Sequence, residues 1–438
     1  MLLTIDKLIY GGNGLARLPA DEKGPGKAVF LPLVLEGERV EAEITEQKPG
    51  FARARPTKIL EPSPHRIAPA CPYFGECGGC HYQHASYEHQ LQIKSAILRE
   101  TFRRVAKLEL EQEIRVHASH PWNYRNRTRL RMRTRPFVLG YNRLRWSELL
   151  AVEQCPISSP LINRAIAALW ELGRADKASA DVNEIEFFAN AEDNQLMAEL
   201  TVQEKGRLRG RKPDLPEFVV ALRAALPEVI GVGVFHATGQ GAVERQDIPA
   251  ELRETFGADH LVYSTAATDY QVSAGSFFQT NRFLTDKLLE LAGEGRSGEH
   301  ALDLYAGVGL FSVVLAQGFR SVSAVESAPV AFRDLKNNCP GSVTIYRATT
   351  EQFLSELQPS KRFDLVVVDP PRAGLGEQVA RLLAGRGTPR ITYVSCDPAT
   401  LARDLTVLVK SGYRIEEAHL VDLFPQTFHI ESVLQLVR

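Results

Sequence analysis

The sequence predicts a mixed α/β fold in three parts, of which the last is built on a parallel β-sheet. Short strand-like runs separated by turn residues fill the first part, and a segment rich in proline and cysteine follows it. After about residue 265, apolar strand-like runs alternate with helix-like segments, which is the pattern of βαβ units. A chain of 438 residues is long enough for two or three domains. We expect a small β-barrel over 1–61, a mixed α+β domain over 62–265 and the parallel sheet over 266–438.

The composition excludes several classes of protein. The chain is 44% hydrophobic and 24% charged, and 52 Lys and Arg residues against 53 Asp and Glu residues give a net charge of −1. This balance argues against bulk attraction to nucleic acid or membrane but allows local basic patches. The sequence has no run of apolar residues long enough for a transmembrane helix and no signal-peptide pattern at its start, so we expect a cytoplasmic protein. Six cysteines are too few for a disulfide scaffold.

The first part has the pattern of a small barrel or sandwich. Residues 27–34 and 38–45 are rich in Val, Leu, Phe and Ile, and glycines at 11–14 mark a turn. Pro32 inside the first run indicates an edge strand, because proline has no N–H to give to a ladder. Prolines from 56 to 69 mark the end of this part, and residues 87–106 then have helical periodicity.

A group of cysteines follows the boundary. Cys71, Cys77 and Cys80 have the spacing Cys-x5-Cys-x2-Cys, and Cys155 supplies a fourth thiol far downstream. Four thiolates suit either a tetrahedral zinc ion or an iron–sulfur cluster. The Cys-x2-Cys pair is common in zinc sites, whereas the x5 gap and the lone fourth cysteine favour a [4Fe–4S] cluster.

Arginine alternates strictly along the segment that comes next, at Arg125, Arg127, Arg129, Arg131, Arg133 and Arg135. On a strand this period places all six on one face. One interpretation is that acidic side chains elsewhere pair with them or that they protect an edge strand. The other is a track for RNA phosphates, which the segregation of nine arginines without an acid in residues 114–146 favours. The aromatic residues Trp122, Tyr124, Tyr141 and Trp146 flank the run and could stack on unpaired bases.

A glycine-containing turn closes the first strand of the C-terminal sheet. The turn Asp303-Leu304-Tyr305-Ala306-Gly307-Val308-Gly309 lets the backbone approach a ligand closely. Glu326 ends the next strand, where a carboxylate can accept hydrogen bonds from ribose hydroxyls. The pattern suits a dinucleotide or an adenosyl cofactor, and the missing third glycine disfavours a pyrophosphate.

The turn Asp369-Pro370-Pro371-Arg372 follows the apolar run 363–368. The two prolines fix the backbone, so the Asp369 carboxylate is directed into the cleft at the edge of the sheet. Enzymes that methylate the amino groups of bases have an aromatic residue after this motif. Arg372 at that position argues against amino-group methylation.

A cysteine and a glutamate lie where two further strands are expected to begin or end. Cys396 follows the run 391–394, and the helix expected from residue 399 could stabilise its thiolate through the helix dipole. Glu431 precedes the last strand, 432–437, and a glutamate among apolar neighbours has the raised pKa of a general base. His429 is the rival base, although we expect it to hold Glu431 or to line the pocket.

Together these motifs resemble the bacterial RNA (uracil-5-)-methyltransferases that carry an N-terminal TRAM domain, an OB-like RNA-binding barrel. The resemblance covers essentially the whole chain. It includes Phe277-Phe278-Gln279-Thr280-Asn281 and the terminal motif from Phe424 to Glu431 besides the motifs above. It implies that the C-terminal part is a Rossmann-like, class I, S-adenosylmethionine-dependent methyltransferase domain.

The resemblance also implies roles for individual residues. Gln279, Tyr305, Glu326 and Asp369 would contact S-adenosyl-L-methionine, Cys396 would be the nucleophile and Glu431 the proton acceptor. One branch of the family carries a [4Fe–4S] cluster on cysteines with this spacing, for which we expect a structural or RNA-contact role. Two positions depart from the family pattern: Gln426 stands where histidine is more common, and Thr349 replaces an asparagine that would touch adenine.

The resulting expectation is a monomeric enzyme that methylates C5 of a uridine in RNA, with 23S rRNA as the expected substrate and tRNA as the alternative. Two other readings stay open at this point. A Rossmann-type oxidoreductase would use NAD and the cluster for electron transfer, but it would leave Cys396 and Glu431 without a role. A non-catalytic RNA-binding protein would retain the cofactor fold without transferring a methyl group.

Overall fold

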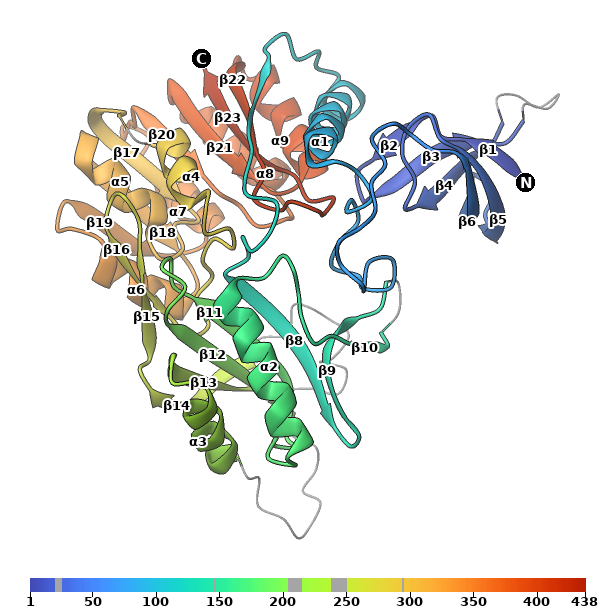
Figure 1. Cartoon of the computed structure of the whole chain (residues 1–438). Coiled ribbons are helices and arrows are strands. Elements are labelled where there is room, and N and C mark those ends of the chain that lie inside the picture. Colours follow the sequence, from blue (N-terminus) through green and yellow to red (C-terminus); the bar gives the residue numbers. More distant parts are fainter. Residues whose placement is uncertain (20–25, 145–146, 204–214, 238–249, 294) are drawn as a thin grey trace.

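The structure is a computed structural model that describes residues 1–438 except 20–25, 145–146, 204–214, 238–249 and 294. Trp146 therefore lies outside the described residues. Figure 1 shows a small N-terminal sheet in blue, a central sheet in green and a C-terminal sheet in orange and red. In the described part of the chain, no helix is long and apolar enough to cross a membrane.

The N-terminal sheet is a curled sheet of six strands in the order β1-β5-β6-β4-β3-β2. Its strands are β1 (Leu2–Thr4), β2 (Lys7–Ile9), β3 (Asn13–Arg17), β4 (Ala28–Pro32), β5 (Arg39–Gln47) and β6 (Phe51–Glu61). The edge position expected for Pro32 is wrong, because β4 lies between β6 and β3. Proline is tolerated there because β6 pairs only with Ala28 to Phe30. Pro56 lies inside β6, next to a register shift between Glu41 and Ala42.

The central sheet has the strand order β10-β9-β8-β11-β12-β13-β14. Its strands are β8 (Arg127–Thr134), β9 (Phe137–Asn142), β10 (Leu149–Ala151), β11 (Val182–Ala189), β12 (Leu196–Gln203), β13 (Val229–Ala237) and β14 (Ala250–Gly257). The helices α2 (Pro160–Arg174) and α3 (Leu215–Ala225) cover one face (Figure 1). Leu130 and Met132 of β8 point into that core, so the alternating arginines of β8 lie on the other face.

The C-terminal sheet has eight strands in the order β19-β18-β17-β20-β21-β23-β22-β7. Its strands are β7 (Ile114–His117), β17 (Gly298–Leu304), β18 (Phe319–Glu326), β19 (Val343–Arg347), β20 (Leu365–Val368), β21 (Arg390–Ser395), β22 (Arg414–Val421) and β23 (Glu431–Val437). The strands from β19 to β21 are parallel, and β23 runs antiparallel to both β21 and β22. The carboxyl end of β21 and the amino end of β23 therefore meet at one edge.

Helices cover both faces of this sheet and enclose two apolar cores. The helices are α4 (Thr285–Ala292), α5 (Leu310–Gly318), α6 (Pro329–Asn338), α7 (Thr350–Glu356), α8 (Gly376–Gly385) and α9 (Pro398–Lys410). The hairpin of β15 (His260–Ser264) and β16 (Asp269–Ser273) packs into one core, and α8 and α9 pack into the other. The expected α/β fold with a methyltransferase-like sheet is confirmed.

One segment of the expected central domain lies against the C-terminal sheet. Helix α1 (Tyr87–Thr101) continues into the π-helical turn η1 (Phe102–Ala106), and both pack into the core that contains α9. Strand β7 pairs in parallel with β22 and forms the edge of the C-terminal sheet. The chain thus enters the C-terminal sheet before it builds the central sheet, and the boundaries at 61 and 265 remain proposals.

The N-terminal sheet is docked on the C-terminal part through apolar contacts. Leu8 and Leu35 are buried in the same core as α1 and α9, and Tyr10 packs against it. Lys7 of β2 forms an ion pair with Glu100 of α1. The strand β2 and its following loop consequently reach the same edge of the C-terminal sheet as Cys396.

Candidate active site

Cys396 and Glu431 come together at the edge of the C-terminal sheet. Strands β21 and β23 pair antiparallel, and their register ends with Ser395 opposite Ser432. Cys396 directly follows β21 and Glu431 is the first residue of β23, so the two residues lie next to each other at this edge. Cys396 is partly exposed, whereas Glu431 is 5% exposed. Cys396 is thus the more exposed of the two residues, and the Glu431 carboxyl is almost wholly buried beside it.

The surroundings of both groups favour their neutral forms. Burial raises the pKa of the Cys396 thiol to about 12, with contributions from the nearby Glu431 and Asp369 carboxyls. Burial also raises the pKa of Glu431 well above its usual range, and Asp369 adds to the effect. The Arg372 guanidinium opposes the shift at both groups. A thiol and a carboxyl with raised pKa values lie within electrostatic reach of one another.

The helix after Cys396 does not offer free amides to a thiolate. Asp397 is the N-cap of α9, and its Oδ1 accepts hydrogen bonds from the N–H groups of Ala399 and Thr400, each at 2.9 Å. The Asp397 carboxylate raises the pKa of Cys396 further. The expected stabilisation of the thiolate by the α9 dipole is thus wrong, because an anion already caps that end of the helix.

Arg372 is the functional residue that sequence reasoning undervalued. It is exposed, and its positive charge lowers the pKa values of Cys396, Glu431 and His429. The sequence feature that could have indicated this residue is its position directly after the Asp-Pro-Pro turn, at the carboxyl end of β20. Its positive charge would favour a thiolate at 396.

His429 lies beside this pair within a group of aromatic side chains. Its ring centroid is 4.3 Å from that of Phe428 and 5.6 Å from that of Phe424. Burial lowers its pKa to about 3, and Arg372 contributes. His429 is therefore a neutral imidazole packed among aromatic rings, and its expected place in the substrate pocket stays a prediction.

Tyr10 brings the N-terminal sheet to the nucleophile, a contact that the sequence pattern did not reveal. Its hydroxyl donates to the carbonyl oxygen of Cys396 at 3.4 Å. Its ring meets Phe428 edge-on, with 5.4 Å between the centroids. Tyr10 and Cys396 are 386 positions apart in the chain, so only the folded structure reveals their contact.

The glycine turn and Glu326 form the adjoining edge of the sheet. Glu326, at the end of β18, accepts hydrogen bonds from the N–H of Gly307 at 2.9 Å and of Ala328 at 2.6 Å. Tyr305 and Gly307 have φ values of 64° and 56°. A Cβ at Gly307 would meet no atom within 4 Å, so the space above the turn is open to a ligand. Asp303 has a buried oxygen, Oδ1, with no partner in the described residues.

Asp303 and Asp369 add two acids to this edge. Burial raises the pKa of each to about 7, and Asp303 contributes to the shift at Asp369. The Ser312 hydroxyl donates to Asp303 at 2.5 Å. A positively charged ligand would stabilise the ionised forms of these two carboxyls.

The segment that carries Gln279 is fixed from the central sheet. Gln279 is buried, and the carbonyl of Ser276 accepts a hydrogen bond from Arg127 at 2.6 Å. Glu199 accepts the N–H of Gly275 at 2.9 Å. Thr349, the second departure from the family pattern, forms a capping box with Gln352 at the start of α7.

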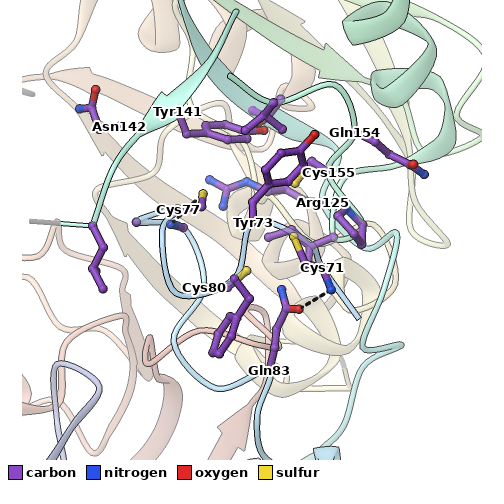
Figure 2. A pocket seen from close by; sticks show the side chains of 18 of the residues that line it. Cys71, Tyr73, Cys77, Cys80, Gln83, Arg125, Tyr141, Asn142, Gln154 and Cys155 are labelled. Carbon is purple, nitrogen blue, oxygen red and sulfur yellow. Dashed lines mark hydrogen bonds between the residues drawn. The ribbon is translucent and has the colours of Figure 1, made fainter. Parts of the chain in front are cut away.

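The four cysteines converge on one cavity. Figure 2 shows Cys71, Cys77, Cys80 and Cys155 directed toward a common space that Tyr73 and Arg125 also border. The cavity has a volume of about 430 Å³. No three His, Cys, Asp or Glu side chains of the described chain are arranged to hold a single metal ion. The four thiols line this cavity together with polar side chains such as Gln83.

Burial favours the neutral thiol at three of these cysteines. It raises the pKa values of Cys71 and Cys80, and it raises that of Cys77 to about 11. The N–H of Cys71 donates to Gln83 at 3.1 Å, as the dashed line in Figure 2 marks. Metal binding here would release protons, because metals bind thiolates.

The arginines of β8 do not form one continuous track. Arg127 is 9% exposed and forms ion pairs with both Glu186 and Glu199. Arg129 is exposed but also pairs with Glu186, at 2.7 Å. For Arg127 the expected RNA contact is wrong, since two buried carboxylates neutralise it. Arg131 and Arg133 continue along the outer face, and Arg125 borders the cysteine cavity.

Comparisons with known proteins agree with this arrangement. A family model described as tRNA (uracil-5-)-methyltransferase matches residues 86–438, and a TRAM domain model matches residues 1–57. An uncharacterized RNA methyltransferase from Aquifex aeolicus is 34% identical and covers 99% of this chain and 97% of its own length. A 23S rRNA (uracil(1939)-C(5))-methyltransferase from Chromohalobacter salexigens is 33% identical and covers 100% of this chain and 89% of its own.

A solved structure also has this fold. The Pyrococcus abyssi tRNA (uracil-54, C5)-methyltransferase, in complex with S-adenosyl-L-homocysteine, is similar over 100% of both chains with a TM-score of 0.75 and 24% identity. Because the family model spans more than three quarters of the chain, from the start of α1 to the last strand, the chain belongs to the RNA (uracil-5-)-methyltransferase family and is an RNA uracil-C5 methyltransferase with an N-terminal TRAM domain.

Proposed function

We propose that this enzyme methylates C5 of one uridine in structured RNA, with 23S rRNA as the substrate, through a covalent bond between Cys396 Sγ and C6 of uracil. The observation that carries the proposal is the proximity of Cys396, directly after β21, and Glu431, at the start of β23, beside the edge formed by Glu326 and Asp369. A pyrimidine ring between the two side chains would present one atom to the thiol and a neighbouring atom to the carboxyl.

The chemistry requires both groups, because C5 of uracil is too weak a nucleophile to take a methyl group directly. Addition of the Cys396 thiolate to C6 turns C5 and O4 into an enolate. C5 then bonds to the methyl group of a sulfonium donor, which leaves as a neutral thioether. The Glu431 carboxylate takes the C5 proton, and the C6–S bond breaks to return the thiolate.

S-adenosyl-L-methionine suits the edge next to this pair and would supply an electrophilic methyl group. Glu326 is fixed by two backbone N–H groups, so its carboxylate is oriented toward ribose hydroxyls. Asp303 and Asp369 would face a cationic cofactor, and the open space above Gly307 leaves room for it. We assign cofactor binding to Gln279, Tyr305, Glu326 and Asp369.

A [4Fe–4S] cluster is the group that suits the cysteine cavity better than zinc. Four thiols and no other donor of this kind line it, and its volume of about 430 Å³ exceeds that of a single ion. Cys71, Cys77, Cys80 and Cys155 would hold the cluster, and the uracil chemistry needs no electron from it.

The RNA would lie across the exposed arginines of β8 and the TRAM sheet. Arg129, Arg131 and Arg133 lie on the outer face of β8, with Arg125 at the cysteine cavity. The choice of 23S rRNA follows relatives at 33% identity that act on it, whereas the tRNA-modifying neighbour is more distant at 24%.

The experiment is methyl transfer from labelled S-adenosyl-L-methionine to 23S rRNA and to tRNA, each prepared from cells that lack this gene. Nucleoside digests analysed by mass spectrometry should contain 5-methyluridine in the rRNA only. Methylation of tRNA alone would show that tRNA, and not 23S rRNA, is the substrate. Binding of RNA without transfer to either RNA would overturn the catalytic proposal.

A further inference from the structure

The turn that leads to Glu431 has an unusual backbone at Gln426. Its φ is 68°, in the left-handed region that residues with a side chain rarely adopt. Gln426 and Thr427 are nevertheless buried, and β23 begins at Glu431 shortly afterwards. A strained, buried turn persists only where its surroundings fix it, and the contacts of Gln426 identify those surroundings.

The backbone carbonyl of Gln426 is bound by the cysteine loop. It accepts hydrogen bonds from the N–H groups of His81 at 2.8 Å and Tyr82 at 2.9 Å, the two residues that follow Cys80. The His81 ring also contacts the Phe428 ring, with 4.6 Å between the centroids. The two residues that follow Cys80 are therefore hydrogen-bonded directly to the turn before Glu431.

The side chain of Gln426 is held by α1. Gln90 donates from Nε2 to Gln426 Oε1 at 2.9 Å, and Gln90 Oε1 accepts the Gln426 N–H at 2.9 Å. The two side chains are 1% and 3% exposed, so these bonds are shielded from water. This reciprocal pair, called the Gln90–Gln426 clamp below, fixes the left-handed turn.

A second connection runs from the other wall of the cavity. The hydroxyl of Tyr124 donates to the carbonyl of Pro425 at 3.0 Å, and Tyr124 directly precedes Arg125, which borders the cysteines. Lys94 of α1 donates to the carbonyl of Phe424 at 2.9 Å and pairs with Asp422. Each carbonyl from Phe424 to Gln426 thus has a fixed donor.

We propose that Gln426 is a positioning residue that connects the four-cysteine site to the catalytic base, so that an intact metal site holds Glu431 in place for proton removal. The proposal rests on the proposed function of Glu431. It assigns the metal site a mechanical role: an ordered Cys80 fixes the N–H groups of His81 and Tyr82, and these fix the turn from which β23 starts.

The test separates two steps of the reaction. In Gln90→Leu and Gln426→Gly, addition of Cys396 to uracil should proceed within about twofold of wild type. Proton removal should slow by roughly 10- to 100-fold, because small misplacements of a reacting group have such effects. A methyl-labelled covalent protein–RNA complex should therefore accumulate on denaturing gels. Gln435→Leu is the control. Like Gln90 and Gln426, Gln435 is a buried glutamine, but it lies within β23 and its side chain forms hydrogen bonds with Leu291 and Thr392.

Hydrogen exchange tests the connection without any turnover. In wild type, removal of the metal should accelerate amide exchange in residues 424–430. In Gln90→Leu these amides should exchange fast even with the metal bound. Unchanged exchange in wild type after metal loss, or equal slowing of addition and proton removal in the variants, would overturn the proposal. Absence of any covalent complex or methylated uridine with wild type would instead contradict the proposed function.

Discussion

Cys396 directly follows β21 and Glu431 begins the antiparallel strand β23, each one position beyond the pair formed by Ser395 and Ser432. An antiparallel strand inserted beside the parallel strands is what creates this relationship, because it brings the start of β23 to the edge where β21 ends. In a wholly parallel sheet, an acid at the start of the last strand would lie at the far edge. The reversal of β23 therefore brings a thiol and a carboxyl to the same edge of the sheet.

The two residues should fail at different steps. Cys396→Ala should form no covalent complex and no methylated uridine. Glu431→Gln should form the complex and transfer the methyl group. It should then release the product roughly 10²- to 10⁴-fold more slowly than wild type, because a general base usually contributes a factor of this size. Denaturing gels with RNA and methyl-labelled cofactor distinguish the two outcomes. A Glu431→Gln enzyme that forms no complex at all would assign the residue to an earlier step.

Formation of the covalent bond should accelerate with pH. Because burial and the nearby carboxyls raise the pKa of Cys396 to about 12, only a small fraction is thiolate at neutral pH. Complex formation with RNA containing 5-fluorouridine, which cannot lose its C5 substituent as a proton, should rise about tenfold per pH unit. Arg372→Met should lower the rate at every pH. A rate independent of pH would mean that bound substrate has already ionised the thiol.

Glu431 should make stability depend on pH. Burial raises its pKa in the folded protein, so the folded state keeps a proton that the unfolded chain releases above the usual value of 4.5. Stability from this group is present at low pH and is lost as pH rises, because the folded state then binds more protons than the unfolded state. Glu431→Gln should therefore raise Tm relative to wild type, by a margin that grows from about pH 5 to about pH 8. A margin that shrinks over this range would contradict the raised pKa.

Local patterns predicted the C-terminal sheet well. Apolar runs at 301–304, 321–325 and 391–394 lie within β17, β18 and β21, because parallel strands buried on both faces are continuously apolar. The carboxyl-edge rule then located the glycine turn, Asp369 and Cys396. In the N-terminal sheet the same approach treated Pro56 as a boundary, although a register shift accommodates it inside β6.

Contacts between distant segments could not be predicted from the sequence. The bonds of Tyr10 to Cys396 and of Gln90 to Gln426 join residues hundreds of positions apart. The period of the arginines correctly placed Arg127, Arg129, Arg131 and Arg133 on one face of β8, although Arg125 and Arg135 lie outside the strand. No local pattern indicated that Glu186 and Glu199 would pair with Arg127. Partners of a charged residue depend on the neighbouring strands, which only the tertiary fold determines.

The cysteine cavity should contain iron. Protein purified without oxygen is expected to be brown and to hold about four irons per chain, and Cys77→Ser should lose the colour and lower Tm. Metal analysis and absorption spectra check this. Colourless protein with one zinc per chain would instead assign the four thiols to a tetrahedral site.

Two arginines of the same strand should have opposite phenotypes. Arg127→Met removes the partner that Glu186 and Glu199 share, leaving Glu186 with Arg129 and Glu199 with the N–H of Gly275, and breaking such a largely buried pair costs about 3–5 kcal/mol of folding free energy. It also frees the carbonyl of Ser276 near Gln279, so cofactor affinity should fall. Arg133→Ala, at an exposed position of β8, should keep stability within about 0.5 kcal/mol and instead weaken RNA binding and reduce its salt dependence. Denaturation curves and binding at several salt concentrations measure both effects. If the salt dependence of RNA binding were unchanged in Arg133→Ala, this part of β8 would not contact the RNA, and the arginines of the strand would have a structural role.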